Sequence, residues 1–399
     1  MKIKATIATA GLFLLCLQWP LLRFLEIPLP PVSSALSSGL AIFGAAYVLS
    51  WGGELAQMEI PQSLAIAFLA LVAVLPEYAV DLYFAWQAGR DPAYVHFATA
   101  NMTGSNRLLI GAGWAAVAFA YYVKKRRGEI ALSEGNRVEI MALILATLYS
   151  LVIPAKGTLS WVDSAFFLAI FVLYIRRASQ SHHEEPELEG PMEAVGRWPR
   201  GRRILVTAFL FVFSGAVILL SAKPFAEGLL DVGRHLGIEP FLLVQWLAPL
   251  ASEAPEFIVA VLFALRARPE AGLGTLISSK VNQWTLLVGM VPLAYAVSAG
   301  RPSAMPLDAR QVEEIFLTSA QSFFALAVIV NLRFSITEAL LIFILFATQI
   351  FFPSTEARTV YAFIYLALGL GWLFVVRGQG EGLKQVFRKG AFSSKITHT

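Results

Sequence analysis

The chain has 399 residues, of which 57% are hydrophobic and 15% charged, and its mean hydropathy is +0.66. This composition excludes an ordinary soluble domain and indicates an integral membrane protein. The single cysteine, Cys16, excludes a disulfide framework and a cysteine metal cluster. The formal charge of +4 does not require a nucleic-acid partner, because membrane proteins keep basic residues on cytoplasmic loops.

Apolar segments long enough to cross a bilayer as helices recur along the whole chain, whereas a membrane barrel would show short alternating segments. We predict an all-α, polytopic membrane protein with about 12 transmembrane helices. They are expected at residues 5–23, 33–52, 60–88, 93–123, 136–153, 158–175, 204–222, 240–266, 272–299, 311–331, 335–352 and 357–376. The first segment lacks a convincing small-residue cleavage site, so we expect a helix there rather than a cleaved signal peptide.

Lysine and arginine residues concentrate on one side of the membrane if the N-terminus is inside. That side then holds the "KKRR" loop, the central polar loop and the C-terminal end of the chain. Since basic residues are retained in the cytoplasm, both termini are expected to be cytoplasmic. The short loops and the compact central loop favour a prokaryotic cytoplasmic membrane.

One long polar segment, residues 176–203, separates two hydrophobic halves. Its mixed charges, prolines and glycines are typical of a solvated tether, so we predict a cytoplasmic linker. The expected organisation is an N-terminal transmembrane half at 1–175, the linker, a C-terminal transmembrane half at 204–377 and a cytoplasmic tail at 378–399.

The two halves contain related segments. "LPEYAVDLYFAW" in the first half matches "APEFIVAVLFAL" in the second, and each is followed by a polar turn and a second span, which contains "TANMTGSNR" or "GTLISSKVNQW". These repeats cover residues 60–120 and 240–295. Because the two Pro-Glu helices are the third and eighth spans, they cross the membrane in opposite directions, which predicts an inverted repeat.

Four acidic residues lie inside the predicted repeats, although an ionised carboxylate at the bilayer centre costs about 2.5–3.5 kcal/mol. Glu77 and Asp81 are spaced i and i+4, and Glu253 and Glu256 are spaced i and i+3, so each pair lies on one helix face. A proline before Glu77 and before Glu256 frees a backbone carbonyl one turn earlier, which adds a neutral oxygen ligand. Oxygen ligands suit Ca²⁺, Na⁺ or proton exchange on a carboxylate, and do not suit zinc or copper.

These segments resemble the two α-repeats of the cation/Ca²⁺ exchanger superfamily, the sodium/calcium exchanger membrane-region fold. The resemblance rests on "LPEYAVD" with "NMTGSNR" and on "PLASEAPEF" with "ISSKVNQW". It implies a ten-helix core with an extra helix at each end, and alternating access driven by sliding peripheral helices. It also implies that two central glutamates, Glu77 and Glu256, are metal ligands. Three serines would complete the cation-binding set: Ser105, Ser279 and Ser252. Further polar lining is expected from Asn101, Asn106, Asn282 and Gln283.

Some positions depart from the family's pattern by losing oxygen ligands. Ala73 and Val74 stand where small hydroxyl residues usually precede the first Pro-Glu, and Leu109 and Gln283 stand where an asparagine or aspartate ligand is expected. Classical Na⁺/Ca²⁺ exchange is therefore not expected.

Other departures add charge. Glu253 stands where the second repeat usually has a hydroxyl residue, and we include it among the cation-binding residues. Lys280 replaces the asparagine of the second "GSN", so we expect a switchable charge pair between Lys280 and Glu253 or Glu256. Asp81 is expected to pair with Arg107.

The predicted function is a secondary-active antiporter that exchanges Ca²⁺ or Na⁺ for H⁺ or Na⁺ across the bilayer through paired glutamates, without a cofactor. A cation channel and a non-transport membrane protein with structural ion pairs are the alternatives. No selectivity filter is recognisable, and no GxGD, HExxH or GxSxG signature stands in a suitable context, so we expect neither a channel nor an enzyme.

Overall fold

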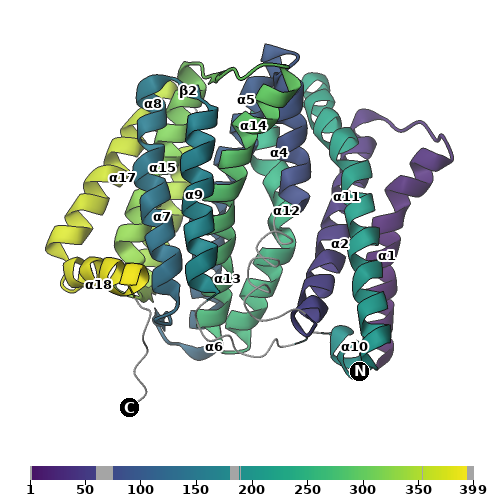
Figure 1. Cartoon of the computed structure of the whole chain (residues 1–399), viewed down its shortest axis with the longest axis horizontal. Coiled ribbons are helices and arrows are strands. Elements are labelled where there is room, and N and C mark those ends of the chain that lie inside the picture. The colour runs from purple at the N-terminus through teal and green to yellow at the C-terminus, as the bar shows by residue number, and fades with distance from the viewer. Residues whose placement is uncertain (1, 60–74, 180–187, 189, 353, 393–399) are drawn as a thin grey trace. The chain divides into compact units, whose positions relative to one another are not determined.

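The computed structural model describes residues 2–59, 75–179, 188, 190–352 and 354–392, and most of this part of the chain is helical (Figure 1). The helices are α1 (Lys2–Phe24), α2 (Pro31–Gln57), α4 (Leu75–Ala88), η1 (Pro92–Tyr94), α5 (Val95–Leu108), η2 (Leu109–Trp114), α6 (Ala115–Lys125), α7 (Asn136–Ser150), α8 (Val152–Lys156), α9 (Trp161–Ala178), α10 (Met192–Gly196), α11 (Arg200–Leu236), α12 (Pro240–Leu265), α13 (Pro269–Asn282), η3 (Gln283–Leu287), α14 (Val288–Ser298), α15 (Ala309–Ile329), α16 (Ile336–Ile350), α17 (Thr355–Val375) and α18 (Gln379–Phe392). The strands are β1 (Glu129–Ala131), β2 (Thr158–Leu159), β3 (Met305–Pro306) and β4 (Arg333–Ser335).

Every predicted transmembrane segment is mainly helical in its described part, although the segments predicted at 158–175 and 335–352 begin with strand residues, Thr158–Leu159 and Ser335. The segment predicted at 60–88 appears as α4, and its residues 60–74 lie outside the described residues, as do Ala73 and Val74. Within the described chain, six helices are long and apolar enough to cross a membrane: α2, α7 with α8, α11, α12, α15 and α17. Two shorter apolar stretches, Thr9–Phe24 and Ile336–Ile350, add to these. The predicted all-α polytopic fold is confirmed.

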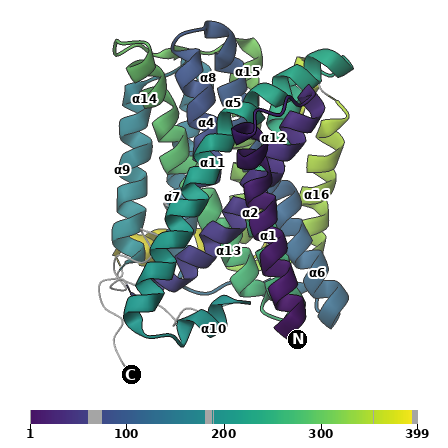
Figure 2. The ribbon, with the colours of Figure 1, turned by 90° about the vertical axis from the view of Figure 1, so that its right-hand side faces the viewer.

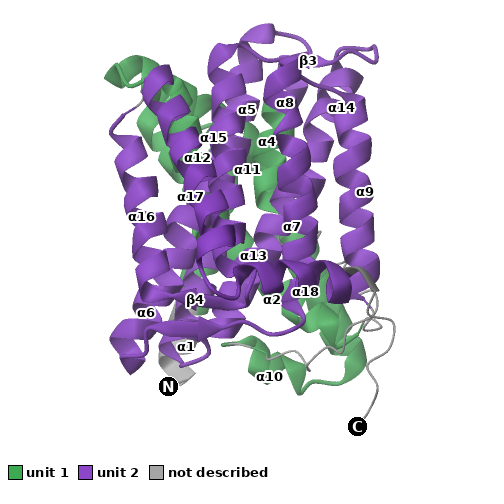
Figure 3. Cartoon of the chain, turned by 90° about the vertical axis from the view of Figure 1, so that its left-hand side faces the viewer, with its two compact units in different colours: residues 1–84, 182–255 green, residues 85–181, 256–399 purple. Residues whose placement is uncertain are grey.

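The chain divides into two compact units (Figure 3). Unit 1 comprises residues 1–84 and 182–255, and unit 2 comprises residues 85–181 and 256–399. One boundary lies in the central linker, whereas the other two lie inside α4 and α12, the helices that carry the Pro-Glu motifs. Each unit therefore contains segments from both halves of the sequence.

Unit 1 is built around α1, α2 and α11, which pack side by side (Figure 2). Their apolar side chains, together with Met192 of α10, form one buried cluster: Cys16, Trp19, Ala41, Ala45, Val48, Leu49, Trp51, Leu55, Met192, Leu210, Val217 and Ile218. Gly228 of α11 lies directly against Ala35 of α2, where a Cβ at position 228 would be 3.0 Å from the alanine Cα. Small residues allow this close approach between membrane helices.

Unit 2 is built around α5 and α15. In α5, His96 is the one residue that is not buried. α15 packs against α5, α7 and α17, and α9 packs against α7 and α14. Figure 1 shows α17, α15, α7 and α9 running alongside one another, with α18 lying across the ends of α17 and α7.

The second spans of the two repeats have the same internal organisation. α5 and α13 each contain 14 residues, continue into the π-helical segments η2 and η3, and end as the 11-residue helices α6 and α14. π-helical segments inside α-helices are frequent at functional sites. Gly111 of η2 lies so close to Phe346 of α16 that a Cβ there would be 2.1 Å from the ring Cγ. Only glycine therefore fits this contact without a shift of the ring.

Two small antiparallel sheets connect loops of the two sequence halves within unit 2. β1 pairs with β4, where Ile130 lies opposite Phe334, and β2 pairs with β3, where Leu159 lies opposite Met305. All four of these side chains are buried. β3 precedes α15 and β4 follows it, so both ends of α15 are bound to loops from the first half.

Helical structure goes beyond the sequence-based expectation in two places. The expectation that α11 ends near residue 222 is wrong, because the helix continues to Leu236. Its additional turns contain two ion pairs at helical spacing, Lys223 with Glu227 and Arg234 with Asp231. The tail also contains α18, which the sequence analysis did not predict. Its buried side is formed at helical spacing by Gln379, Gly382, Val386 and Gly390.

Candidate functional site

The first Pro-Glu motif lies on α4. Glu77 is 2% exposed, and Asp81, one turn further along, is fully buried. Since α4 is helical over this stretch, the two carboxylates lie on the same side of the helix. Tyr83 donates a hydrogen bond of 2.7 Å to the carboxylate of Glu227, which anchors α4 to α11 within unit 1.

The second Pro-Glu motif lies on α12, which contains two internal prolines, Pro249 and Pro255. Ser252 and Glu253 are buried in unit 1, and Glu256, in unit 2, is half-buried. Oε2 of Glu256 is buried and has no hydrogen-bond partner among the residues that the structure describes. Because burying a carboxylate oxygen without a partner is costly, this atom is suited to binding an ion or a proton.

The partner helices α5 and α13 supply the remaining predicted residues, all in unit 2. The buried polar residues are Asn101, Ser105, Asn106 and Arg107 on the first repeat, and Ser279, Lys280, Asn282 and Gln283 on the second. Each repeat also has a side-chain hydrogen bond between residues four apart. Asn106 donates to the carbonyl of Met102 at 2.8 Å, and Gln283 donates to the hydroxyl of Ser279 at 3.5 Å. Both helices thus carry buried polar residues, and these coincide at two aligned positions, Ser105 with Ser279 and Asn106 with Lys280.

Lys280 links these two sets of polar residues. Its ammonium Nζ donates to Oδ1 of Asn106 at 2.9 Å and to the carbonyl oxygen of Asn106 at 3.4 Å. The same Nζ lies 4.6 Å from the ring centroid of Trp284, a cation–π distance. The pair of Lys280 with Glu253 or Glu256, which is expected from the sequence, stays a prediction. The contact of Lys280 with Asn106, across the two repeats, was not predicted.

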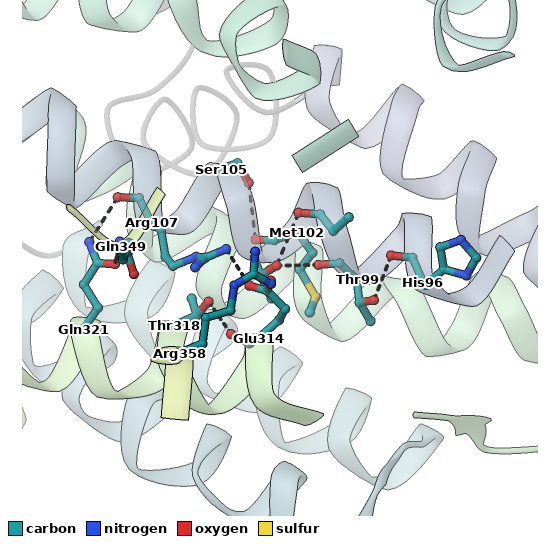
Figure 4. A network of polar contacts seen from close by, with 12 residues as sticks. His96, Thr99, Met102, Ser105, Arg107, Glu314, Thr318, Gln321, Gln349 and Arg358 are labelled. Atoms are coloured by element: carbon teal, nitrogen blue, oxygen red, sulfur yellow. Dashed lines mark hydrogen bonds and ion pairs between the residues drawn. The ribbon is translucent and has the colours of Figure 1, made fainter. Parts of the chain in front are cut away.

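Arg107 takes part in a buried ion network (Figure 4). Its Nη2 lies 2.5 Å from Oε2 of Glu314 on α15, and Arg358 of α17 binds the other oxygen of the same carboxylate. The backbone carbonyl of Arg107 accepts a hydrogen bond of 3.2 Å from Gln321. The three charged side chains are almost completely buried, so their attraction is little screened by water. Asp81, the partner expected for Arg107, belongs to the other unit, and this pairing also stays a prediction.

Glu314 and Arg358 were missed by the sequence analysis. The signal for Glu314 was present, since "VEEIF" places two acids in the first turns of an otherwise apolar predicted span. Arg358 lies at the start of the span predicted at 357–376, and nothing in the sequence indicates its partner. Only the packing of α15 against α17 brings these two residues together.

The structure therefore brings some of the predicted residues together and leaves others apart. Asn106 contacts Lys280, and Ser279 contacts Gln283, all within unit 2. Glu77 and Glu256 belong to different units, so their pairing stays a prediction. Among the described residues, no group of three or more His, Cys, Asp or Glu side chains could hold a metal ion.

Comparison with known proteins adds to these observations. The family model described as sodium/calcium exchanger protein matches the chain twice, at residues 30–179 and 206–355, on either side of the central linker. The chain is 44% identical to the crystal structure of the H⁺/Ca²⁺ exchanger CAX, with a TM-score of 0.94, over 97% of this chain and 98% of the other.

Two more distant relatives point in the same direction. CaxA of Alkalimonas amylolytica, which is named as an antiporter, is 23% identical over 258 residues, 62% of this chain and 76% of CaxA. The sodium-calcium exchanger NCX_Mj is 18% identical with a TM-score of 0.54, over 80% of this chain and 97% of its own, and this similarity shows the fold alone.

Proposed function

This chain belongs to the sodium/calcium exchanger protein family and is an integral, multi-pass membrane protein that acts as a cation/Ca²⁺ exchanger; on that premise we propose that it exchanges Ca²⁺ for H⁺ by alternating access. The identity of 44% with the H⁺/Ca²⁺ exchanger CAX supports Ca²⁺ as the transported ion and H⁺ as the coupled ion. We propose a prokaryotic cytoplasmic membrane with both termini in the cytoplasm. The two sequence halves, 1–175 and 204–377, would form the two repeats of the transporter around the linker, with 378–399 as the cytoplasmic tail.

The observation that carries this proposal is the pair of Pro-Glu helices, each with an acid withdrawn from water. Glu77 is buried on α4, and Oε2 of Glu256 on α12 has no hydrogen-bond partner in the described chain. Each carboxylate, when ionised, would bind Ca²⁺, and each would take up a proton after Ca²⁺ leaves. Because Ca²⁺ and protons compete for the same oxygens, the movement of one ion is coupled to the movement of the other.

Neutral and charged neighbours would complete the site. Ser105, Ser252 and Ser279 would add hydroxyl oxygens, Glu253 a third carboxylate, and Asn101, Asn106, Asn282 and Gln283 the polar lining. Oxygen ligands from several helices suit Ca²⁺, which accepts flexible coordination by carboxylates, carbonyls and neutral side chains.

Lys280 favours H⁺ over Na⁺ as the coupled ion. Its ammonium is held by Asn106 of the opposite repeat and by the Trp284 ring. A positive charge that belongs to the protein at this position repels a second bound cation, which makes an additional Na⁺ site unfavourable. We propose that Lys280 switches between this contact and a pair with Glu253 or Glu256 as Ca²⁺ enters and leaves, and that Asp81 and Arg107 take part as a second charge pair.

The proposal is tested with purified protein in proteoliposomes. Ca²⁺ uptake is measured under an imposed pH gradient, and separately under Na⁺ and K⁺ gradients of the same size. We expect saturable uptake driven by the pH gradient, with proton movement in the opposite direction. Uptake driven only by the Na⁺ gradient would instead indicate Na⁺ as the coupled ion, and a non-saturable Ca²⁺ current without proton movement would indicate a channel.

The site is tested with Glu77→Gln and Glu256→Gln, which keep side-chain size and remove the titrating charge. Each variant is expected to abolish Ca²⁺-coupled proton movement while expression and elution volume stay unchanged. Glu227→Gln is the matched control, because this carboxylate lies on α11 and binds Tyr83 and Lys223 rather than belonging to the proposed site. Transport at the wild-type rate in both Glu77→Gln and Glu256→Gln would rule the assigned site out.

A further inference from the structure

Gln245 on α12 is a buried polar residue that the proposed site does not use. Its side chain is fully buried, and neither its amide nitrogen nor its amide oxygen has a hydrogen-bond partner among the residues that the structure describes. Burying an amide without hydrogen bonds costs free energy, and buried side-chain amides in proteins normally have partners. A leucine of similar size would fill the same space on a transmembrane helix without this cost. An amide in this environment is therefore suited to binding a ligand.

The backbone at the same position has a second available oxygen. Pro249 lies four residues after Gln245 inside α12 and has no N–H group. The carbonyl of Gln245 thus loses the donor that would normally bond to it along the helix. Position 245 combines a buried amide oxygen and a backbone carbonyl oxygen, both neutral and both of the kind that Ca²⁺ accepts.

Gln245 lies on the same face of α12 as Ser252 and Glu253. The buried side of α12 follows the helical repeat through Phe241, Val244, Gln245, Ala248, Pro249, Ser252 and Glu253. Gln245 and Ser252 are seven residues apart, which places them on one face and separates them by about 10 Å along the helix axis. A cation that passes along this face would reach Gln245 before it reaches Ser252 and Glu253.

We propose that Gln245 forms an outer Ca²⁺ site, in which its amide oxygen and its own backbone carbonyl hold the ion on the way between one membrane surface and the glutamates. This inference deepens the proposed function and rests on it. Because both oxygens are neutral, the outer site binds Ca²⁺ weakly and releases it readily, as a conduction pathway requires. With cytoplasmic termini, α12 begins on the external side, so this site serves the external half of the pathway.

The experiment measures the KM for Ca²⁺ from each side of the membrane, with the protein reconstituted in a known orientation. Gln245→Leu removes the amide oxygen at nearly constant volume, and Pro249→Ala restores the N–H that occupies the carbonyl. Each change is expected to raise the external KM about three- to tenfold, the effect of losing one oxygen contact, and to leave the cytoplasmic KM within about twofold of wild type. Gln379→Leu is the matched control, because Gln379 is also buried with an amide oxygen that lacks a partner in the described chain, but lies on α18.

The outcomes separate this proposal from the proposed function. An effect confined to the external KM in both variants supports the outer site. Unchanged values on both sides, or equal changes on both sides, would overturn it while Ca²⁺/H⁺ exchange by the wild type continues to support the proposed function. If Gln245→Leu does not yield folded protein, Pro249→Ala decides the question alone. Wild-type protein that moves no Ca²⁺ against a pH gradient would instead remove the proposed function itself.

Discussion

Arg107 on α5 and Glu314 on α15 form an ion pair inside unit 2, with 2.5 Å between Nη2 and Oε2 and with both side chains almost fully buried. Arg358 binds the second oxygen of the same carboxylate from α17. Arg107 directly follows Asn106, which contacts Lys280. The ion pair therefore holds α5 in place directly beside Asn106, the α5 residue that contacts Lys280 of the opposite repeat.

This arrangement predicts different effects for two substitutions that change the charge equally. Arg107→Met leaves the pair between Glu314 and Arg358, and Arg358→Met leaves the pair between Glu314 and Arg107, so each variant keeps one buried ion pair. Only the first removes the ion pair between α5 and α15. We expect Arg107→Met to lower the maximal rate of Ca²⁺ uptake about tenfold and Arg358→Met to change it less than about threefold, with similar losses of melting temperature.

The two variants are compared by uptake kinetics and by thermal denaturation in detergent. Arg107→Lys serves as the conservative rescue, because it returns the positive charge without the guanidinium geometry. Equal losses of rate in Arg107→Met and Arg358→Met would contradict a specific role for the contact between α5 and α15.

Lys280→Asn restores the residue that the family pattern has at this position. Removal of the ammonium should allow a second cation to bind near the glutamates, so we expect Na⁺ to begin to compete with Ca²⁺ and the dependence of uptake on pH to become weaker. Uptake with Na⁺ or choline outside, at a series of pH values, measures both effects. Lys280→Arg keeps the charge and should keep the wild-type response to Na⁺. A pH profile that is the same in wild type and Lys280→Asn would show that this ammonium has no part in coupling.

The docking of α18 is expected to depend on pH through Glu134. Hydrogen bonds from Arg137, and further from Lys389 of α18, lower the pKa of Glu134 from 4.5 to about 2. Only the part of this lowering that Lys389 causes is linked to docking, because Arg137 lies three residues from Glu134 and stays beside it when α18 is undocked. That part stabilises the docked state when Glu134 is ionised, and it is lost as the pH falls toward 2 and Glu134 becomes protonated. Glu134→Gln should remove this pH dependence.

Docking is followed by the fluorescence anisotropy of a dye on Gly380→Cys, an exposed position on α18. Glu381→Gln is the control, because Glu381 pairs only at 3.9 Å with Lys384 of the same helix and should not affect docking. An anisotropy that falls at the same pH with and without Glu134 would mean that another group controls the contact.

The packing of η2 predicts a cost for one added methyl group. A Cβ at Gly111 would lie 2.1 Å from the Phe346 ring, so Gly111→Ala should lower the melting temperature by several degrees, an overpacking cost of about 1–3 kcal/mol. Gly274→Ala on α13 is the matched control, because its Cβ would meet nothing closer than 3.5 Å. There the loss of glycine flexibility should leave stability unchanged or slightly higher. Equal melting temperatures for both variants would contradict the tight contact.

Hydropathy and repeated motifs were enough to predict the membrane fold and the family. Apolar segments of membrane length have few alternatives to helices, and "LPEYAVD" with "PLASEAPEF" identifies the two repeats. The end of α11 was wrongly predicted because its last turns mix charged residues with apolar ones, which lowers their hydropathy, although their apolar side, with Phe225, Leu229 and Leu230, is buried.

The contacts between distant residues could not be read from spacing. Local patterns indicate which side chains share a helix face, and Glu77 with Asp81 is such a case. Lys280 with Asn106, and Arg107 with Glu314, are brought together by helices far apart in the sequence, and a single sequence contains no information on which of several buried charges meet. Glu314 is recognisable in the sequence as an acid inside an apolar span, but the sequence does not indicate which residue pairs with it.

The position of α15 between two strands has a mechanical consequence. β3 and β4 hydrogen-bond the segments at its two ends to loops of the other sequence half, and Glu314, in its first turns, binds α5 and α17. An axial shift of α15 by one residue would break backbone hydrogen bonds at both ends at once. Within unit 2, α15 is thus held in place at both ends. A helix that moves during the transport cycle must therefore move relative to α15, because α15 cannot shift with it.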